Sequence, residues 1–173
     1  LVGGAAMYHG FVEQLKATTP DISWTDATHL IEPHKAVKSV EEIALIRRTT
    51  ALQDQVFSKV CEHLRPGMRE HEVMAYAQYL SQLLGAEQGL FLGSSSPEGR
   101  AAVFRPRSQW GRTLQRGDTL TVLIETNGPG GYYTELSRTL VLGKASQELA
   151  DTHQAVVEAR ANTVAHFRDG ADC

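Results

Sequence analysis

Cysteine, excess charge and long apolar runs are all scarce in this 173-residue sequence, and each shortage excludes a class of protein. The two cysteines, Cys61 and Cys173, form no C-x-x-C motif and are too few for a disulfide framework, so we expect a reducing, cytoplasmic location. A net charge of -3 is too small to predict binding to nucleic acid or to an anionic membrane. No segment approaches the roughly 18 apolar residues of a membrane span, and the first residues lack the pattern of a secretory signal.

The composition that remains is that of a globular protein. Hydrophobic residues make up 42% and charged residues 21% of the sequence, which excludes disorder, collagen and coiled coil as descriptions of the whole chain. The sequence begins with Leu rather than Met, and it ends shortly after Gly170, a residue type that commonly stops helices. We therefore expect a piece of a longer chain, with further sequence on both sides.

Helical periodicity predicts two long helices in the first half of the chain. Ser39 and Glu42 form a capping-box pattern at the start of the first helix, which Pro66 ends. The second helix is predicted from about residue 70 to residue 84, with a glycine directly after it. Three further elements are expected, namely a short helix at Phe11–Lys16, a strand and turn at Ile22–Ile31, and a final helix at about Ser146–Phe167.

Between the second and the final helix the pattern changes to that of β-strands, with short runs of branched and aromatic residues separated by Gly, Pro and Ser. These runs are Gly89–Gly93, Ala101–Phe104, Thr119–Glu125 and Tyr132–Leu142. The last two flank a glycine-rich segment, 127–131, in which glycine permits the backbone angles of a tight hairpin. We therefore predict an α+β fold in which helices pack on a largely antiparallel sheet.

The ends of two predicted helices share a short sequence similarity. HLRPGM at 63–68 and HFRDGA at 166–171 share His, Arg and Gly at equivalent positions. Coincidence is the alternative, because amphipathic helices commonly end in glycine. If the similarity is a true repeat, the chain is one half of a two-fold arrangement.

Three segments, VKSVEEIALIRR, HLRPGMREHEV and LQRGDTLTVLIETNGPGGYYTELSRTLVLG, together resemble the creatinase and Xaa-Pro aminopeptidase family, which has the pita-bread fold. The resemblance implies that residues 1–34 are the tail of an N-terminal domain and residues 35–173 the first half of the catalytic domain, with helices on a curved sheet. It also implies a homodimeric hydrolase of C–N bonds, most often the bond preceding proline, acting on a peptide or small amide. Two divalent metal ions (Mn, Co or Zn) are expected in the intact protein, and a protein without metal is an equal alternative.

The same resemblance indicates Glu125 and Glu135 as a metal-binding pair. Two cations held close together need carboxylates to balance their charge and to keep a bridging water deprotonated. Glu135 takes the place of one family Asp, but Leu123 stands at the place of the other, so a bulge would have to bring Glu125 there. Two alternatives stay open: the glutamates make structural ion pairs or caps near the turn, or they line a polar substrate pocket without metal.

The remaining candidate residues lie on or near the hairpin. Tyr133 and Arg138 are candidate catalytic residues. Of the adjacent residues Tyr132 and Tyr133, one is expected to reach the pocket with its hydroxyl, because side chains of a strand alternate between faces. Arg105 and Arg107 stand where the family has a histidine, and are candidate substrate-binding residues because guanidinium groups bind carboxylates bidentately. The alternative is that Arg105 and Arg107 are exposed to solvent in a polar loop and bind no substrate. Asp118 is expected to accept hydrogen bonds from backbone donors in a turn.

Three functions remain open from the sequence. They are a metal-dependent hydrolase of the Xaa-Pro peptidase type, a metal-independent creatinase-like hydrolase of a small nitrogenous compound, and a binding module that has lost catalysis. Leu123 and the missing histidine favour the last of these. Ser137 replaces a glutamate of creatinase, so creatine is not an obvious substrate. This chain alone is expected to be inactive, because one half cannot preorganise a site that two halves build.

Overall fold

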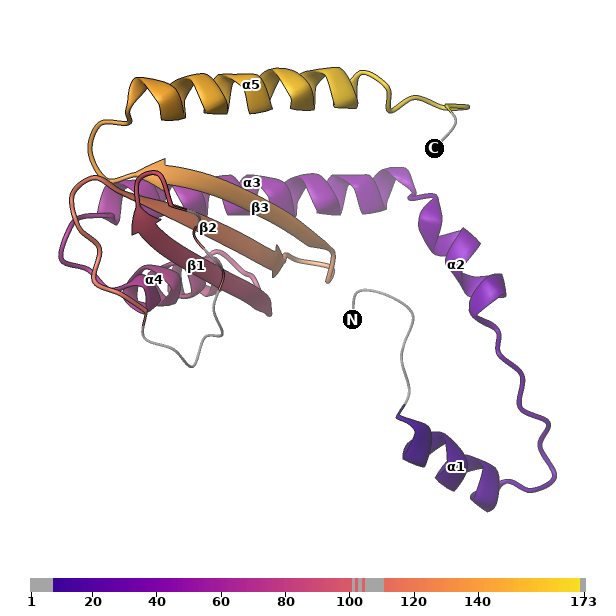
Figure 1. Cartoon of the computed structure of the whole chain (residues 1–173). Coiled ribbons are helices and arrows are strands. Elements are labelled where there is room, and N and C mark those ends of the chain that lie inside the picture. Colours follow the sequence, from indigo (N-terminus) through magenta and orange to yellow (C-terminus); the bar gives the residue numbers. More distant parts are fainter. Residues whose placement is uncertain (1–7, 101, 103, 105–110, 172–173) are drawn as a thin grey trace.

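The computed structural model describes residues 8–100, 102, 104 and 111–171 (Figure 1). Its helices and strands, in chain order, are α1 (His9–Thr18), α2 (Thr28–Ala36), α3 (Val40–His63), α4 (Glu70–Leu83), β1 (Gly89–Pro97), β2 (Asp118–Asn127), β3 (Tyr133–Val141) and α5 (Gln147–Val164). The two long helices, the hairpin strands and the final helix lie where the sequence predicts them.

The sheet consists of three antiparallel strands in the order β1-β2-β3. The register of β2 with β3 places Glu125 opposite Glu135. In the turn between them Gly130 and Gly131 have φ values of 94° and 81°, which glycine adopts without the steric penalty of a side chain. The predicted glycine-rich hairpin is therefore confirmed.

One face of this sheet packs against α3 and α4. In β2 the side chains on that face belong to Leu120, Val122 and Ile124, and all three are fully buried. The core around them is completed by apolar side chains of both helices and of β1, including Leu52, Val56, Val60, Val73, Ala77 and Phe91. Because side chains of a strand alternate between faces, the odd-numbered residues of β2 and β3 project from the other side of the sheet, called the open face below.

The start of α3 has the capping box that the sequence predicts. The side chain of Ser39 accepts a hydrogen bond from the backbone N–H of Glu42, and the Glu42 carboxylate accepts one from the backbone N–H of Ser39. These two bonds satisfy backbone donors that the first turn of a helix otherwise leaves without partners. They explain why the helix begins at this point.

The N-terminal region differs from the prediction. The strand expected at Ile22–Ile31 is wrong, because Thr28–Ala36 forms the helix α2. Asp26 accepts hydrogen bonds from the backbone N–H and the hydroxyl of Thr28 (2.9 and 2.6 Å) just before the helix, and the N-cap residue itself, Ala27, makes no side-chain cap. Of the strand expected at Ala101–Phe104, residues 102 and 104 are not in a strand, and 101 and 103 lie outside the described residues.

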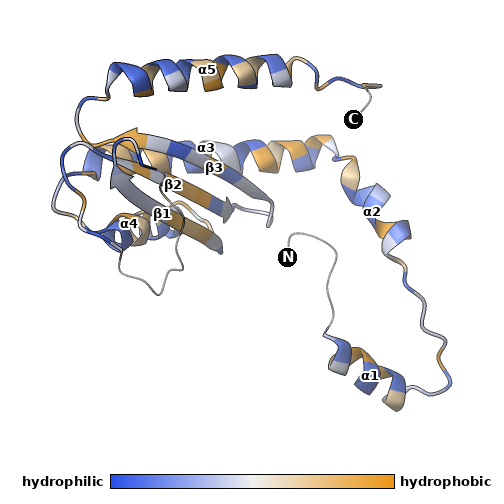
Figure 2. Ribbon diagram, in the orientation of Figure 1, coloured by the Kyte–Doolittle hydropathy of each residue, from blue (hydrophilic) through white to orange (hydrophobic). Residues whose placement is uncertain are grey.

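Three helices lie apart from the core. No residue of α1, α2 or α5 is buried, and Figure 1 shows α1 and α2 extending away from the sheet. Figure 2 shows apolar residues along these helices, and Phe11, Ile31 and Val156 are among the exposed ones. Among the described residues, no helix combines the length and the apolar character that crossing a membrane would require. The domain boundary expected after residue 34 falls within α2 and stays a prediction.

Substitution of a core leucine tests this arrangement. Leu120→Ala removes a fully buried side chain from the centre of β2, so we expect it to lower the free energy of unfolding by about 2–5 kcal/mol. Leu83→Ala makes the same change at a side chain that is 65% exposed, and should change stability by no more than about 0.5 kcal/mol. Urea unfolding of both variants is the measurement, and equal losses would contradict the placement of the core.

Candidate functional site

The open face carries two carboxylates directly opposite each other. Glu125 of β2 and Glu135 of β3 are paired across the ladder, and the Cβ atoms of such a pair lie about 4.5–5.5 Å apart. Glu125 is partly buried and Glu135 is exposed. Neither glutamate forms an ion pair within the part of the chain that the structure describes. The sheet thus brings together the two residues that the sequence predicts as a metal pair.

Leucine side chains surround the pair on the same face. Leu90 of β1 lies opposite Glu125, and the neighbouring row consists of Leu92, Leu123 and Ser137. The register therefore places Leu123 next to the carboxylates rather than in the core. The pair sits on a partly apolar surface, where attraction between the carboxylates and a bound cation is stronger than in bulk water.

The two adjacent tyrosines point to opposite faces. The hydroxyl of Tyr133 donates to Gln88 Oε1 (3.0 Å), on the side of the sheet that carries Glu135. The hydroxyl of Tyr132 instead donates to the Glu42 carboxylate at the start of α3. The sequence leaves open which tyrosine reaches toward the site, and the structure puts Tyr133 on that side.

Arg138 does not join the carboxylate pair. Arg138 lies opposite Val122, so it belongs to the face against which the helices pack, and its guanidinium donates to the carbonyl of Ser137 (2.8 Å). Its placement follows from the period of two along a strand, since it is an odd number of residues from Glu135. Arg105 and Arg107 lie outside the described residues.

The open face supplies only part of a metal site. Two opposed carboxylates suit a hard divalent cation, which prefers oxygen ligands. Within residues 8–100, 102, 104 and 111–171, however, no three His, Cys, Asp or Glu side chains come together as a cation site. Leu123 adds no donor atom. Glu125 and Glu135 therefore fit a divalent ion as two of its ligands, and further ligands have to come from elsewhere.

A buried polar network lies at the other end of the sheet. The Glu70 carboxylate, 4% exposed, accepts hydrogen bonds from the backbone N–H and hydroxyl of Ser95 (2.6 and 2.7 Å) and from the backbone N–H of Arg112 (3.2 Å). Arg112 binds the Asp118 carboxylate with both terminal nitrogens (2.7 and 3.2 Å). Asp118 also accepts from the backbone N–H of Gln115, which confirms its predicted role in a turn. The sequence analysis missed Glu70 and Arg112 because only tertiary contacts reveal them.

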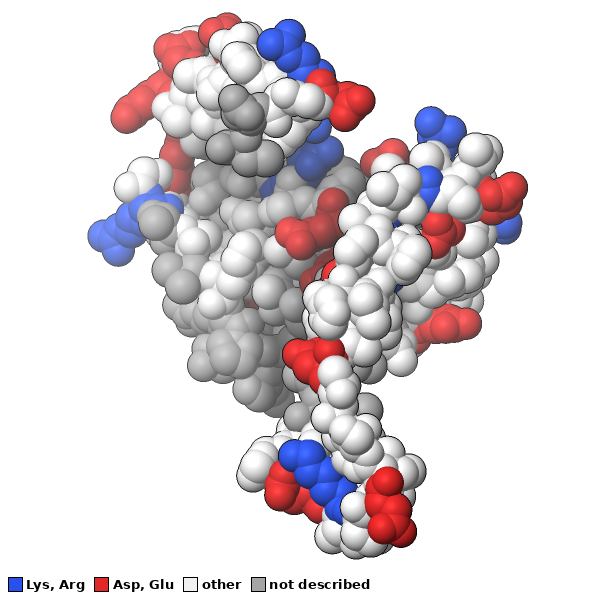
Figure 3. Space-filling view, turned by 90° about the vertical axis from the view of Figure 1, so that its right-hand side faces the viewer, with Lys and Arg blue, Asp and Glu red and all other residues white. Residues whose placement is uncertain are grey.

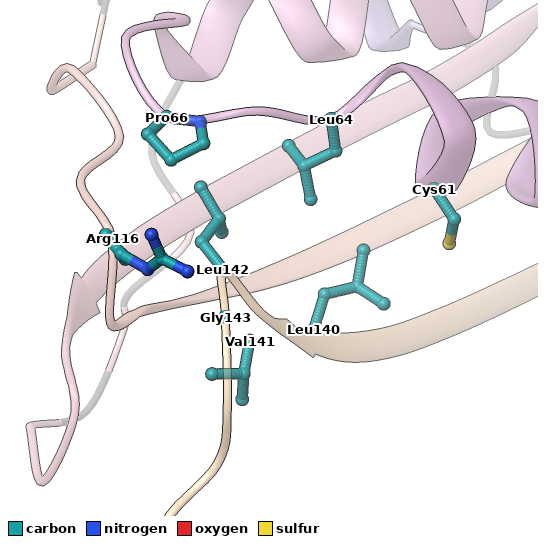
Figure 4. A pocket seen from close by; sticks show the side chains of 8 residues that line it. All are labelled: Cys61, Leu64, Pro66, Arg116, Leu140, Val141, Leu142 and Gly143. Atoms are coloured by element: carbon teal, nitrogen blue, oxygen red, sulfur yellow. The ribbon is translucent and has the colours of Figure 1, made fainter.

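Two cavities lie away from the carboxylates. One cavity, of about 410 Å³, lies between the end of α3 and the end of β3. Cys61, Leu64 and Arg116 are among the side chains that line it (Figure 4). Partial burial raises the pKa of the Cys61 thiol, and the neighbouring Glu62 adds to the rise, so little reactive thiolate is present at neutral pH. Another cavity, of about 470 Å³, separates β3 from α5. Neither contains a residue that the sequence predicts for the site.

On the face that Figure 3 shows, acidic and basic side chains of the described residues are scattered and form no continuous basic patch. This distribution agrees with the small net charge of the sequence. Among the described residues, that face has no basic stripe of the kind that binds a nucleic acid backbone.

The Tyr132–Glu42 contact leads to a pH-dependent prediction. The Tyr132 hydroxyl and, to a lesser extent, the backbone N–H of Ser39 lower the pKa of Glu42. A carboxyl with a lowered pKa stabilises the fold above its unfolded pKa, and this stabilisation is lost as the pH falls through the folded value. Tyr132→Phe should therefore raise the pKa of Glu42 and destabilise the protein more at neutral than at acid pH.

The measurements are NMR titration of the Glu42 carboxyl, and urea unfolding at neutral and at acid pH. Tyr133→Phe is the matched control, because the hydroxyl of Tyr133 donates to a neutral amide and its loss should not depend on pH in this range. An unchanged Glu42 pKa in Tyr132→Phe would contradict the contact.

Comparison with known proteins identifies the family. The profile of metallopeptidase family M24 matches residues 44–173. The chain is 25% identical over 174 residues to the Xaa-Pro dipeptidase of Pyrococcus horikoshii, covering 96% of this chain and 47% of that protein. It is also 25% identical over 172 residues to the uncharacterized peptidase YqhT of Bacillus subtilis, covering 95% of this chain and 46% of that protein. The chain thus spans about half the length of the curated relatives it matches.

The solved structures agree with this result. The prolidase of Pyrococcus furiosus superimposes with a TM-score of 0.72 at 23% identity, over 90% of this chain and 45% of that structure. At this identity the likeness shows the fold alone, and it confirms the predicted pita-bread α+β architecture. With three quarters of its length matched by the family profile, the chain belongs to metallopeptidase family M24.

Proposed function

We propose that this chain forms part of a hydrolase that cleaves peptide C–N bonds, with Xaa-Pro dipeptides or related amides as substrates. The observation that carries the proposal is the Glu125–Glu135 pair on the open face of a sheet that belongs to family M24. The names of the matched relatives, an Xaa-Pro dipeptidase and a prolidase, support the substrate class. Membership of the family supports hydrolysis as the reaction.

Under this proposal Glu125 and Glu135 hold divalent metal, with Mn, Co or Zn as the candidates. When bound, such an ion polarises the scissile carbonyl and makes a water molecule more acidic. The carboxylates contribute two negative charges in a geometry that the ladder fixes. Tyr133, whose hydroxyl lies on the same side of the sheet, would orient a substrate under this proposal. Arg138 lies on the opposite face and has no part in the proposed reaction.

A metal-independent hydrolase of a small nitrogenous compound is the second candidate. The observation that favours it is Leu123, which lies beside the pair where a further oxygen ligand would strengthen a metal site. A binding module without catalysis is supported by the same residue. Chelation separates the two enzymes, because only the metal-independent enzyme stays active after divalent ions are removed. Substrate binding without turnover would identify the binding module.

The proposal also covers the assembly of the active protein. A site that needs ligands beyond Glu125 and Glu135 is incomplete within the part of the chain that the structure describes, and we propose that these 173 residues alone do not turn over substrate. A homodimer and a cytoplasmic location, both expected from the sequence, stay predictions. Analytical ultracentrifugation and cell fractionation would test them.

The decisive experiment measures hydrolysis of an Xaa-Pro dipeptide by the longer protein that contains this chain, with added manganese or cobalt. We expect turnover that a chelator abolishes and that Glu135→Gln reduces at least about 100-fold, since a neutral amide no longer balances the charge of the ion. Glu148→Gln, the same change at an exposed position of α5, should leave turnover unchanged. Full activity of Glu135→Gln would contradict the assignment.

A further inference from the structure

One buried polar side chain of α3 connects the helix to both strands that carry the carboxylates. Gln53 is 1% exposed and lies among apolar neighbours of the core, including Leu52 and Val56. A buried amide is costly unless its donors find acceptors. The partners of Gln53 are therefore informative about why a polar residue occupies this position.

The Gln53 amide donates two hydrogen bonds to the hairpin. Its Nε2 donates to the carbonyl of Ile124 in β2 (3.1 Å) and to the carbonyl of Thr134 in β3 (2.5 Å). These two residues directly precede Glu125 and Glu135 in the sequence. A single side chain thus ties the two strands together at the row that presents the carboxylates, from the opposite face of the sheet.

The row needs such a tie because its two carboxylates repel each other. Like charges directly opposite in an antiparallel pair are destabilising, and among the described residues neither glutamate has a salt-bridge partner. β3 is also an edge strand, paired only with β2 in the described sheet. A contact from the packed helix therefore adds to the β2–β3 ladder in opposing a separation or shift of this edge strand.

A second contact of the same kind lies one helical turn earlier. Thr49 is fully buried, and its hydroxyl lies 3.2 Å from two acceptors, the carbonyl of Tyr132 and the carbonyl of Leu45 in its own helix. The turn approaches the helix so closely here that a Cβ on Gly128 would lie 2.4 Å from Thr49 Oγ1. Thr49 therefore holds the tip of the hairpin, and Gln53 holds its carboxylate row.

We infer that Gln53 is a positioning residue, whose two hydrogen bonds fix the separation and register of Glu125 and Glu135. The inference rests on the proposed function, in which that pair is the reactive part of the site. The structural claim, that Gln53 holds β3 against β2, does not depend on the proposed reaction. An experiment can therefore contradict the structural claim or the functional claim separately.

The structural test uses Gln53→Met, which keeps the length of the side chain and removes both donors. We expect backbone amides of β3 around Glu135 to exchange with solvent about 3- to 10-fold faster, as for the loss of hydrogen bonds of ordinary strength. Amides of β1 and α4 should exchange as in the wild type. Gln55→Met is the matched control, because Gln55 is an exposed residue of the same helix. Exchange identical to that of the control, or raised equally throughout the core, would overturn the inference.

A second pair of variants covers the case in which Gln53→Met does not fold. Thr49→Val replaces a buried threonine with a side chain of the same shape, and Thr50→Val makes the same change at an exposed position. We expect the backbone amides at the hairpin tip to exchange faster than in the wild type in Thr49→Val, and at the wild-type rate in Thr50→Val. Equal behaviour of the two would contradict the role of these hydrogen bonds.

The functional test uses the longer protein and an Xaa-Pro dipeptide. Gln53→Met should lower kcat while leaving KM within about two-fold. The reason is that it displaces the carboxylates that hold the metal and leaves the groups that bind the substrate in place. It should have no further effect once Glu135→Gln is present, because residues that act as a unit are non-additive. Additive effects would overturn the positioning role. Absence of hydrolysis in the wild type, with the exchange pattern as expected, would count against the proposed function alone.

Discussion

The arrangement of the site depends on the alternation of side chains along the β2–β3 hairpin. Leu120, Val122 and Ile124 are fully buried against α3 and α4, so a shift of one residue would expose the whole set to solvent. The energetic cost of that exposure fixes which side chains of β2 face the core, and the hydrogen bonds of Gln53 hold β3 in register with β2. Once the register is fixed, Glu125 and Glu135 have to face each other on the open side. The core of the protein therefore determines the geometry of the candidate site.

Local sequence patterns were sufficient for most of the elements. The capping box of Ser39 and Glu42 and the glycines of the hairpin act through neighbouring backbone groups, so the sequence alone reveals them. The helix at Thr28–Ala36 was missed because its large apolar residues, Leu30 and Ile31, are adjacent and show no helical period, and no side chain caps its start. The local sequence there contains neither of the signals that revealed the other helices.

The candidate site was less predictable than the fold. The family pattern led to Glu125 and Glu135, but only the strand register shows that they form a row and that Arg138 lies on the opposite face. No local motif marks Glu70 and Gln53 as buried residues that bind partners far away in the sequence. Such polar contacts depend on the tertiary structure, since each partner is supplied by a different element.

The central claim, that the hairpin places residues 125 and 135 directly opposite each other on the open face, can be tested with a disulfide. Cysteines at directly opposed positions of an antiparallel pair are close enough to be bridged with little movement. The account predicts that Glu125→Cys/Glu135→Cys, in a background of Cys61→Ala and Cys173→Ala, forms an intramolecular disulfide under mild oxidation, detected by mass spectrometry. Two cysteines that remain reduced, or that join only different molecules, would contradict it.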